Sequence, residues 1–352
     1  MIQASLKTKL YPLALTLAAV LAAILVGLIL VAFFAKDFGG AISAFMDGMV
    51  GSTYAIGASL NRAVSLMLVG MGFVFANRAN LVNVGAEGQL ALGGIFATAV
   101  ALYGGVTGLP LGLAWILPLL AGSVAGAGWS GIAGYLKVRR GTNEVISTLL
   151  LVFIGLLLVY WSVQSDVLLR KPRTDSATLP ESASIPDPTI LPSLTSNPES
   201  PLHIGLVIAL VLAVIVWILL NKAEIGVRLR AIGLNETAAR RAGIVAGRDM
   251  FIAMLVSGAF SGLAGAIMIT GEQQYLTAGF TSGYGFDGLV AGLLARDSIP
   301  GVLLAAIFFG FLRSGGLSME MSSGVPSAVV FIIQGLVVVF IAGASRFLDK
   351  KG

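Results

Sequence analysis

Long apolar stretches separated by short polar ones follow one another along almost the whole chain. A helix needs about 20 consecutive, mostly apolar residues to cross about 30 Å of hydrocarbon. Repeated stretches of this kind indicate a helical bundle, because backbone groups in lipid must be hydrogen-bonded within their own segment. The pattern predicts an all-α fold, a polytopic transmembrane helical bundle that forms one domain over residues 1–352. About ten spans are expected, at residues 11–35, 60–77, 90–104, 112–135, 144–162, 203–220, 250–270, 286–297, 299–315 and 326–344.

The composition agrees with a membrane protein. Hydrophobic residues make up 57% of the chain and charged residues 11%, against about 25% charged in an average soluble domain. The first apolar stretch, 11–35, follows Lys7 and Lys9 as in a signal peptide. It is too long for a signal-peptide core and no small-residue cleavage pattern follows it, so we expect it to remain as the first transmembrane helix.

Basic residues gather on one side of this predicted topology. With the N-terminus inside, 16 of the 22 Lys and Arg residues fall on the cytoplasmic side. Cytoplasmic loops carry such an excess, so both termini are predicted to be cytoplasmic. Spans two to five and seven to ten then run in opposite orientations, as in an inverted repeat. The basic residues expected outside are Lys36, Arg62, Arg170, Lys171, Arg173 and Arg313.

Two long polar connections interrupt the apolar pattern. Residues 163–202, expected outside, hold seven of the chain's 12 prolines, which excludes a long helix there. This segment is either a disordered insertion or a docking surface for an external partner. Residues 221–249, expected in the cytoplasm, hold six basic and three acidic residues.

A short helix is expected within the second connection, over residues 236–242. Asn235 before it is a good N-cap, and Gly243 after it is a good stop. Because a simple hairpin needs only a few residues, such a helix has one of two purposes. It either anchors the loop at anionic lipid head groups or docks onto a cytoplasmic partner.

Polar residues break the helical pattern at the cytoplasmic end of the second span. Irregular backbone at membrane depth survives only where it lines protein or a watery cavity. Asn83, Glu87 and Gln89 in this break are therefore candidates for a translocation path. The alternative is an ordinary cytoplasmic turn whose charges are solvated.

A second polar cluster stands at the entrance of the eighth predicted span. Tyr284 and Phe286 could stack on a flat ring, and Asp287 could accept hydrogen bonds from ring or sugar donors. Asp287 could equally cap the helix N-terminus. For Glu144, at the start of the fifth span, capping is the favoured interpretation.

The inventory of residues excludes several activities. There is no Cys and a single His, so Cys-rich metal sites and thiolate chemistry are excluded and no metal site is predicted. His203 is interpreted as an interfacial residue at a helix start. The sequence lacks a Gly-Lys pair and hence a phosphate-binding loop, and it contains neither HExxH nor GxSxG. The acids lie mainly at span ends, without an obvious proton relay, and no catalytic residue is expected.

Three motifs in this order resemble the permease subunits of bacterial nucleoside-type ABC importers. They are AEGQLALG at residues 86–93 within the stretch 78–93, GVRLRAIGLNETAARRAGI at 226–244 and GYGFDG at 283–288. The resemblance extends from about residue 60 to the C-terminus. The wider group includes ribose and branched-chain amino acid permeases, whose loops are similar to the motif at 226–244, and the other two motifs favour nucleosides.

The resemblance implies a transport subunit, carrying purine nucleosides in preference, without an ATPase site of its own. Its expected partners are a second permease subunit, cytoplasmic ABC ATPases that bind the ATP and Mg²⁺, and an external substrate-binding protein. It also implies that loop 226–244 holds the helix that couples to the ATPase. The coupling residues would be Gly233, Asn235, Glu236, Ala239, Arg240 and Gly243.

Other functions remain open from the sequence. The substrate could be riboflavin or a sugar. A secondary transporter would work without an ATPase, and a membrane receptor or scaffold would carry no flux. The Pro-rich segment 163–202 departs from the family pattern and leaves the docking geometry of an external partner open.

Overall fold

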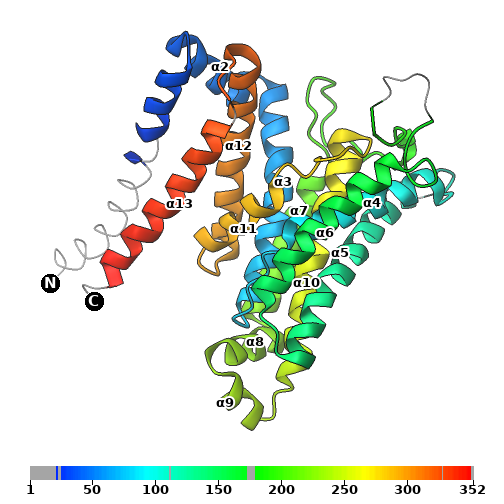
Figure 1. Cartoon of the computed structure of the whole chain (residues 1–352), viewed down its shortest axis with the longest axis vertical. Coiled ribbons are helices and arrows are strands. Elements are labelled where there is room, and N and C mark those ends of the chain that lie inside the picture. Colours follow the sequence, from blue (N-terminus) through cyan, green and yellow to red (C-terminus); the bar gives the residue numbers. More distant parts are fainter. Residues whose placement is uncertain (1–20, 23–24, 111, 173–178, 327, 350–352) are drawn as a thin grey trace. The chain divides into compact units, whose positions relative to one another are not determined.

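The computed structural model describes residues 21–22, 25–110, 112–172, 179–326 and 328–349, without the side chains of 337–338 and 341–349. Throughout these residues the ordered elements are helices, and strand-like pairing is limited to three isolated bridges (Figure 1). Six of the described helices are long and apolar enough to cross a membrane, and the pair α7 and α8, bent by 64°, adds a seventh candidate. The predicted class, an all-α membrane protein, is therefore confirmed.

The six candidate spans include the longest helices of the chain. They are α3 (Thr53–Asn77), α4 (Ala86–Tyr103), α5 (Leu113–Arg140), α6 (Glu144–Gln164), α10 (Ala246–Ile267, continued by a π-helical turn, Met268–Gln273) and α12 (Ile299–Ser323). The remaining helices are α2 (Phe38–Val50), α7 (Gly205–Asn221), α8 (Glu224–Leu234), α9 (Glu236–Arg241), α11 (Tyr284–Leu294) and α13 (Ala328–Asp349).

The helices differ from the predicted spans in several places. The eighth predicted span is wrong as a complete crossing, because the 11 residues of α11 cover only about 16 Å at 1.5 Å per residue. The helix α2 was not predicted. Of the first predicted span, 11–35, residues 11–20 and 23–24 lie outside the described residues, and Leu25–Phe34 is helical. The count of ten and the inverted repeat stay predictions.

The chain divides into two compact units, residues 1–62 with 308–352 and residues 63–307. In the first unit, Arg62 lies inside α3 and donates to the Ser314 hydroxyl of α12 at 2.5 Å. Arg313, also within α12, lies 5.1 Å from the centre of the Phe331 ring. The charge count put both arginines on the outer side, near the ends of the predicted spans 60–77 and 299–315. The structure places them further inside their helices, because α3 begins at Thr53 and α12 continues to Ser323.

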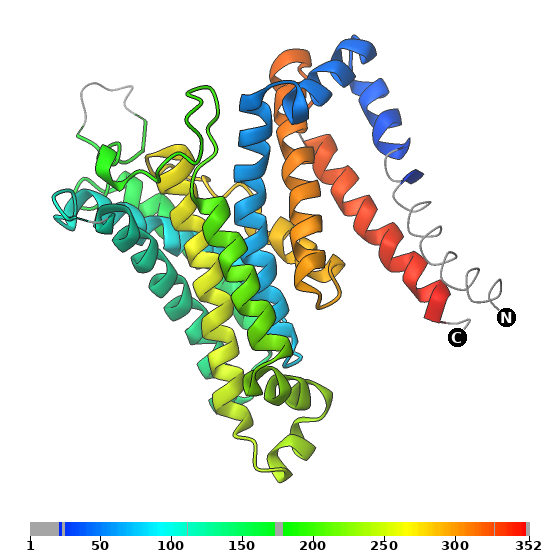
Figure 2. The same ribbon diagram turned by 180° about the vertical axis from the view of Figure 1, so that it is seen from behind.

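The second unit is centred on α4, α5 and α10, whose backbones nearly touch. A Cβ atom added to Gly93 of α4 would lie 2.1 Å from the Gly262 carbonyl oxygen of α10, and one added to Gly126 of α5 would lie 2.3 Å from the Gly258 oxygen. Only glycine permits such close approach. We call this contact the glycine seam. The glycine seam explains why glycine is so frequent within the apolar stretches of this unit. Figure 2 shows the helices from behind.

The Pro-rich segment packs onto the second unit along most of its length. Its backbone N–H groups at Ser182, Ile185 and Leu191 donate to the carbonyls of Leu276, Gln274 and Thr270, at 2.8–2.9 Å. Residues 182–191 are thus bound to the end of α10 and the backbone that follows it, which contradicts a disordered insertion for this part. Figure 1 shows them at the opposite end of this unit from α8 and α9.

Candidate functional site

The break after α3 is held by a buried amide pair. Asn83 and Gln89 exchange two side-chain hydrogen bonds of 3.0 and 2.9 Å. The second donor of Asn83 reaches the Ser257 hydroxyl of α10 at 2.9 Å, and its oxygen also accepts from the Gly85 N–H at 3.0 Å. An amide side chain offers four hydrogen-bonding positions, and all four of Asn83 are used. Asn83 therefore fixes the turn that leads into α4.

Glu87 joins the two polar clusters that the sequence singled out. Its carboxylate oxygens accept from the N–H groups of Gly283 at 2.8 Å and Gly285 at 2.6 Å, at the start of α11. These N–H groups belong to the first turn of α11 and have no partner within the helix. A carboxylate also suits the positive end of the helix dipole. The side chain is 3% exposed, so the alternative of a solvated turn is wrong for this residue.

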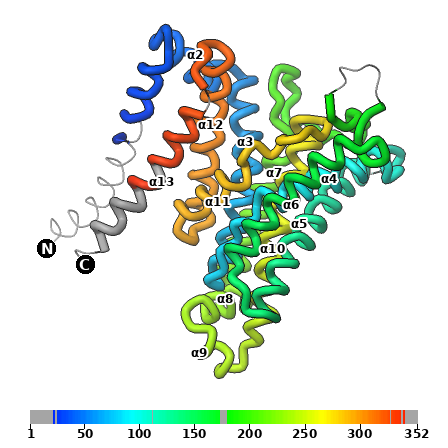
Figure 3. The backbone as a smooth tube through the Cα atoms, viewed as in Figure 1, coloured from blue at the N-terminus to red at the C-terminus, as the bar shows by residue number. Residues whose placement is uncertain are grey.

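The starts of α4 and α11 meet backbone to backbone. A Cβ atom on Gly285 would lie 2.2 Å from the Glu87 nitrogen, so only glycine fits there. Figure 3 traces the irregular backbone that leads from α10 to this contact. The sequence predicted both motifs but not that they touch, because the contact depends on how helices far apart in the chain pack.

The aromatic residues of α11 do not share one face. Tyr284 is buried, whereas Phe286 is 39% exposed and Asp287 is half-buried. Residues two positions apart point to nearly opposite sides of a helix, so one flat ring cannot stack on both within this chain. Asp287 was a candidate cap, but the described capping carboxylate is that of Glu87.

The structure also places two further polar residues, Glu144 and His203. The cap of α6 is Asn143, whose side chain accepts from the N–H groups of Val145 and Ile146. Glu144 instead pairs with Lys137 at the end of α5, at 2.7 Å. His203 lies just before the start of α7 and is buried, and its Nδ1 accepts from the Gly205 N–H at 3.1 Å. Burial lowers the pKa of His203 to about 4, so the ring is neutral at physiological pH.

The connection 221–249 contains the predicted short helix, α9. Asn235 caps it by accepting from the Ala238 N–H at 3.0 Å, and Gly243 follows it at a φ of +87°, as a stop signal should. Arg240 pairs with Glu236 across one turn at 2.7 Å. Ala239 is buried against its own chain and is not part of the exposed face of α9.

The helix α8, which precedes α9, rests directly on the turn between α3 and α4. A Cβ atom on Gly233 would lie 2.4 Å from the Arg78 carbonyl oxygen. Arg228 of α8 also lies 4.0 Å from the buried carboxylate of Asp249 at the start of α10. Movement of α8 would therefore press on the turn, because the backbone contact at Gly233 leaves no gap to absorb it.

The same turn is tied to the far end of α11. Asn77 donates to the Asp297 carboxylate at 2.8 Å, and Arg78 donates to the Asp297 backbone carbonyl at 3.1 Å. The turn thus lies between α8, the amide pair of Asn83 and both ends of α11. Among the residues described, no group of three or more His, Asp or Glu could hold a metal ion.

Comparison with known proteins assigns this arrangement to a family. The family model described as branched-chain amino acid transport system / permease component matches residues 55–342. A guanosine ABC transporter permease protein of Bacillus subtilis is 37% identical over 88% of this chain and 89% of its own. A nucleoside ABC transporter permease protein of Lactococcus lactis is 31% identical over 90% of this chain and 86% of its own.

A third relative is named for a different substrate. A glucose ABC transporter permease protein of Haloferax volcanii is 36% identical over 84% of this chain and 78% of its own. All three are permease proteins of ABC transporters, and each aligns over most of both chains. The chain described here is therefore a multi-pass membrane protein of the permease-component family of branched-chain amino acid transport systems.

Proposed function

We propose that this chain is the membrane-spanning subunit of an ATP-driven importer that carries nucleosides, purine nucleosides in preference, into the cytoplasm. The observation that carries the proposal is the 37% identity to the guanosine permease protein over 88% of the chain. The similarity to the nucleoside permease protein points the same way. Glucose is the second candidate, because the glucose permease protein is almost as similar, at 36% identity.

The proposal includes the other parts of the transporter. A cytoplasmic ABC ATPase binds ATP and Mg²⁺, a second permease subunit, identical or not, completes the path, and an external protein delivers the substrate. The chain lies in the inner membrane with both termini in the cytoplasm, which the distribution of basic residues supports.

The residues of the two polar clusters take different roles in this proposal. Phe286 and Asp287, on the accessible side of α11, contact the substrate, through stacking on the base and hydrogen bonding to ring or sugar donors. Glu87, with Asn83, Gln89 and the buried Tyr284, holds the frame that positions them. This division is favoured by burial, because a group whose hydrogen bonds are all used within the protein has none left for a substrate.

Coupling to the ATPase is assigned to α9 and the residues beside it. The apolar side chains of Leu234 and Val245 are 82% and 64% exposed on either side of α9, next to the exposed charges of Glu236 and Arg240. Exposed apolar side chains beside charged ones suit a protein-binding surface. A push on α9 would reach the path through Gly233 and the turn at Arg78.

The test is uptake into proteoliposomes that contain the permease with its ATPase and binding protein. We expect labelled guanosine to accumulate only when ATP is supplied, with other purine nucleosides competing and glucose not. Accumulation of glucose in its place would transfer the assignment to the second candidate. Accumulation driven by a proton or sodium gradient without ATP would contradict the importer assignment altogether.

A further inference from the structure

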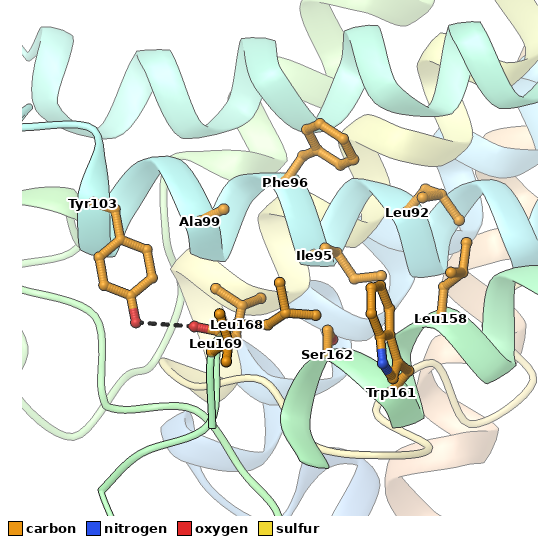
Figure 4. Close-up of a pocket in the computed structure, with 11 residues that line it drawn as sticks. Leu92, Ile95, Phe96, Ala99, Tyr103, Leu158, Trp161, Ser162, Leu168 and Leu169 are labelled. Carbon is orange, nitrogen blue, oxygen red and sulfur yellow. Dashed lines mark hydrogen bonds between the residues drawn. The ribbon is translucent and has the colours of Figure 1, made fainter. Parts of the chain in front are cut away.

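An apolar groove of about 360 Å³ runs between α4 and α6 on the outer surface of the second unit. Figure 4 shows Ile95, Leu158 and Trp161 gathered at one end and Tyr103 with Leu168 at the other. The volume falls within the roughly 300–1,000 Å³ typical of ligand pockets. No residue of the lining carries a charge. The groove is therefore large enough for a ligand and suited to an uncharged one.

The polar groups of the groove do not suit a nucleoside or a sugar. The Ser162 hydroxyl donates to the Val159 carbonyl at 2.7 Å, within α6. The Tyr103 hydroxyl donates to the Leu168 carbonyl at 3.3 Å, the dashed line of Figure 4. A hydroxyl-rich solute buried here would lose its hydrogen bonds to water without replacement, at a cost of about 1–3 kcal/mol for each group. The occupant should be a hydrocarbon.

The position and length of the groove identify which hydrocarbon. Both α4 and α6 are candidate spans, and most of the apolar surface of α6 faces away from the rest of the chain. From Leu92 to Tyr103 the groove follows α4 for about 16 Å, close to half of the ~30 Å hydrocarbon thickness of a bilayer. Tyr103, the last residue of α4, is 66% exposed, and such rings are enriched where a span leaves the hydrocarbon.

We propose that this groove binds one acyl chain of a bilayer phospholipid within a single leaflet. The proposal does not depend on the substrate of the transporter. The groove offers an acyl chain matching length, an uncharged lining and no unused hydroxyl, and it opens toward the lipid side of two spans. A bound chain would fill the space between α4 and α6 that their own side chains leave open.

The test uses the purified transporter in nanodiscs made with a phospholipid that carries a photoreactive diazirine in the middle of one acyl chain. Mass spectrometry of the labelled protein should find the strongest labelling at residues 92–103 and 158–169. Ala99→Phe places a ring inside the groove and should reduce this labelling to the level of the exposed α6 surface around Leu150. Leu150→Phe, on α6 but outside the groove, should leave the labelling pattern unchanged.

The wild-type pattern is informative even if Ala99→Phe does not fold, which a thermal unfolding measurement would reveal. Groove peptides labelled no more strongly than the surface around Leu150 would overturn the proposal. It would also be overturned if these peptides stayed unlabelled while Val167→Cys formed a disulfide between two copies of the chain, because the groove would then be a protein interface.

Discussion

Glu87 fixes the start of a helix that lies 196 residues away in the sequence. Its two oxygens replace the caps that α11 lacks in its own sequence, since Gly283 has no side chain to offer. A hydrogen bond from a backbone N–H to an ionised carboxylate is about twice as strong as one between neutral groups. The positive end of α11 is thereby filled by the protein itself, which leaves it unsuited to an anionic substrate and agrees with a neutral one such as a nucleoside.

Replacing Glu87 should therefore destabilise the protein. Glu87→Ala leaves two buried N–H groups without partners, each costing about 1–3 kcal/mol, and the thermal unfolding midpoint in detergent should fall. Glu87→Gln keeps one acceptor oxygen and should lose less. Glu199→Ala, on the exposed part of the external segment, is the control. A midpoint for Glu87→Ala equal to that of the control would show that the cap is dispensable.

The buried His203 makes stability depend on pH in a defined direction. In the unfolded chain, His203 binds a proton below its usual pKa of about 6.5. In the folded chain it does so only below its lowered pKa of about 4. Stability should therefore be complete above pH 6.5 and fall between pH 6.5 and 4, by up to about 3 kcal/mol at 1.36 kcal/mol per pKa unit.

The measurement compares the unfolding midpoints of wild type and His203→Gln at pH 7.5 and pH 5. His203 is the only histidine of the chain, so the difference between the two proteins isolates its contribution from that of the carboxylates. The wild type should lose more stability on acidification than the variant. Parallel losses would mean that the protonated ring is tolerated in the fold.

At the scale of elements, α9 is the most informative helix of the connection 221–249. Ala239 was expected to face the partner, but its burial means that Ala239→Trp would overpack the chain itself. Ala238, its exposed neighbour, is the better probe. Ala238→Trp should leave the fold intact, reduce copurification of the ATPase and abolish ATP-dependent uptake, because a bulky ring on the docking face prevents seating.

The matched control is Ser184→Trp, at an exposed position of the external segment, which should leave copurification of the ATPase as in the wild type. Asn235→Ala should have an intermediate effect, since the loss of an N-cap costs about 1 kcal/mol of helix stability. If Ala238→Trp transports normally, α9 is not the coupling helix, and anchoring at lipid head groups becomes the better explanation of the loop.

What the sequence could predict at this scale was local. The cap at Asn235 and the stop at Gly243 follow from neighbours within a few residues, and α9 lies where they place it. The short length of α11 was also local, because Arg296 and Asp297 end its apolar run and the predicted span 286–297 was already about as short. The contact between Glu87 and Gly285 and the contact between Gly233 and Arg78 are set by long-range packing, which no local pattern encodes.

At the scale of the whole molecule, the predicted topology can be tested directly because the chain contains no cysteine. Single cysteines at Ser184 and Thr237, both at exposed positions, should react with a membrane-impermeant reagent from opposite sides. Intact cells should label the first, and only opened cells the second. Labelling of both in intact cells would overturn the cytoplasmic placement of α9 and with it the coupling assignment.

The glycine seam between α4, α5 and α10 has a consequence for how this molecule can vary. Glycine is the smallest residue, so every substitution at Gly93, Gly126 or Gly262 adds atoms where carbonyl groups of the opposite helix already stand. The spacing of these three helices is thus at its lower limit, and mutation can only widen it. A widened seam would separate backbones that now lie in direct contact and open gaps between them, so these positions leave the chain little room for substitution.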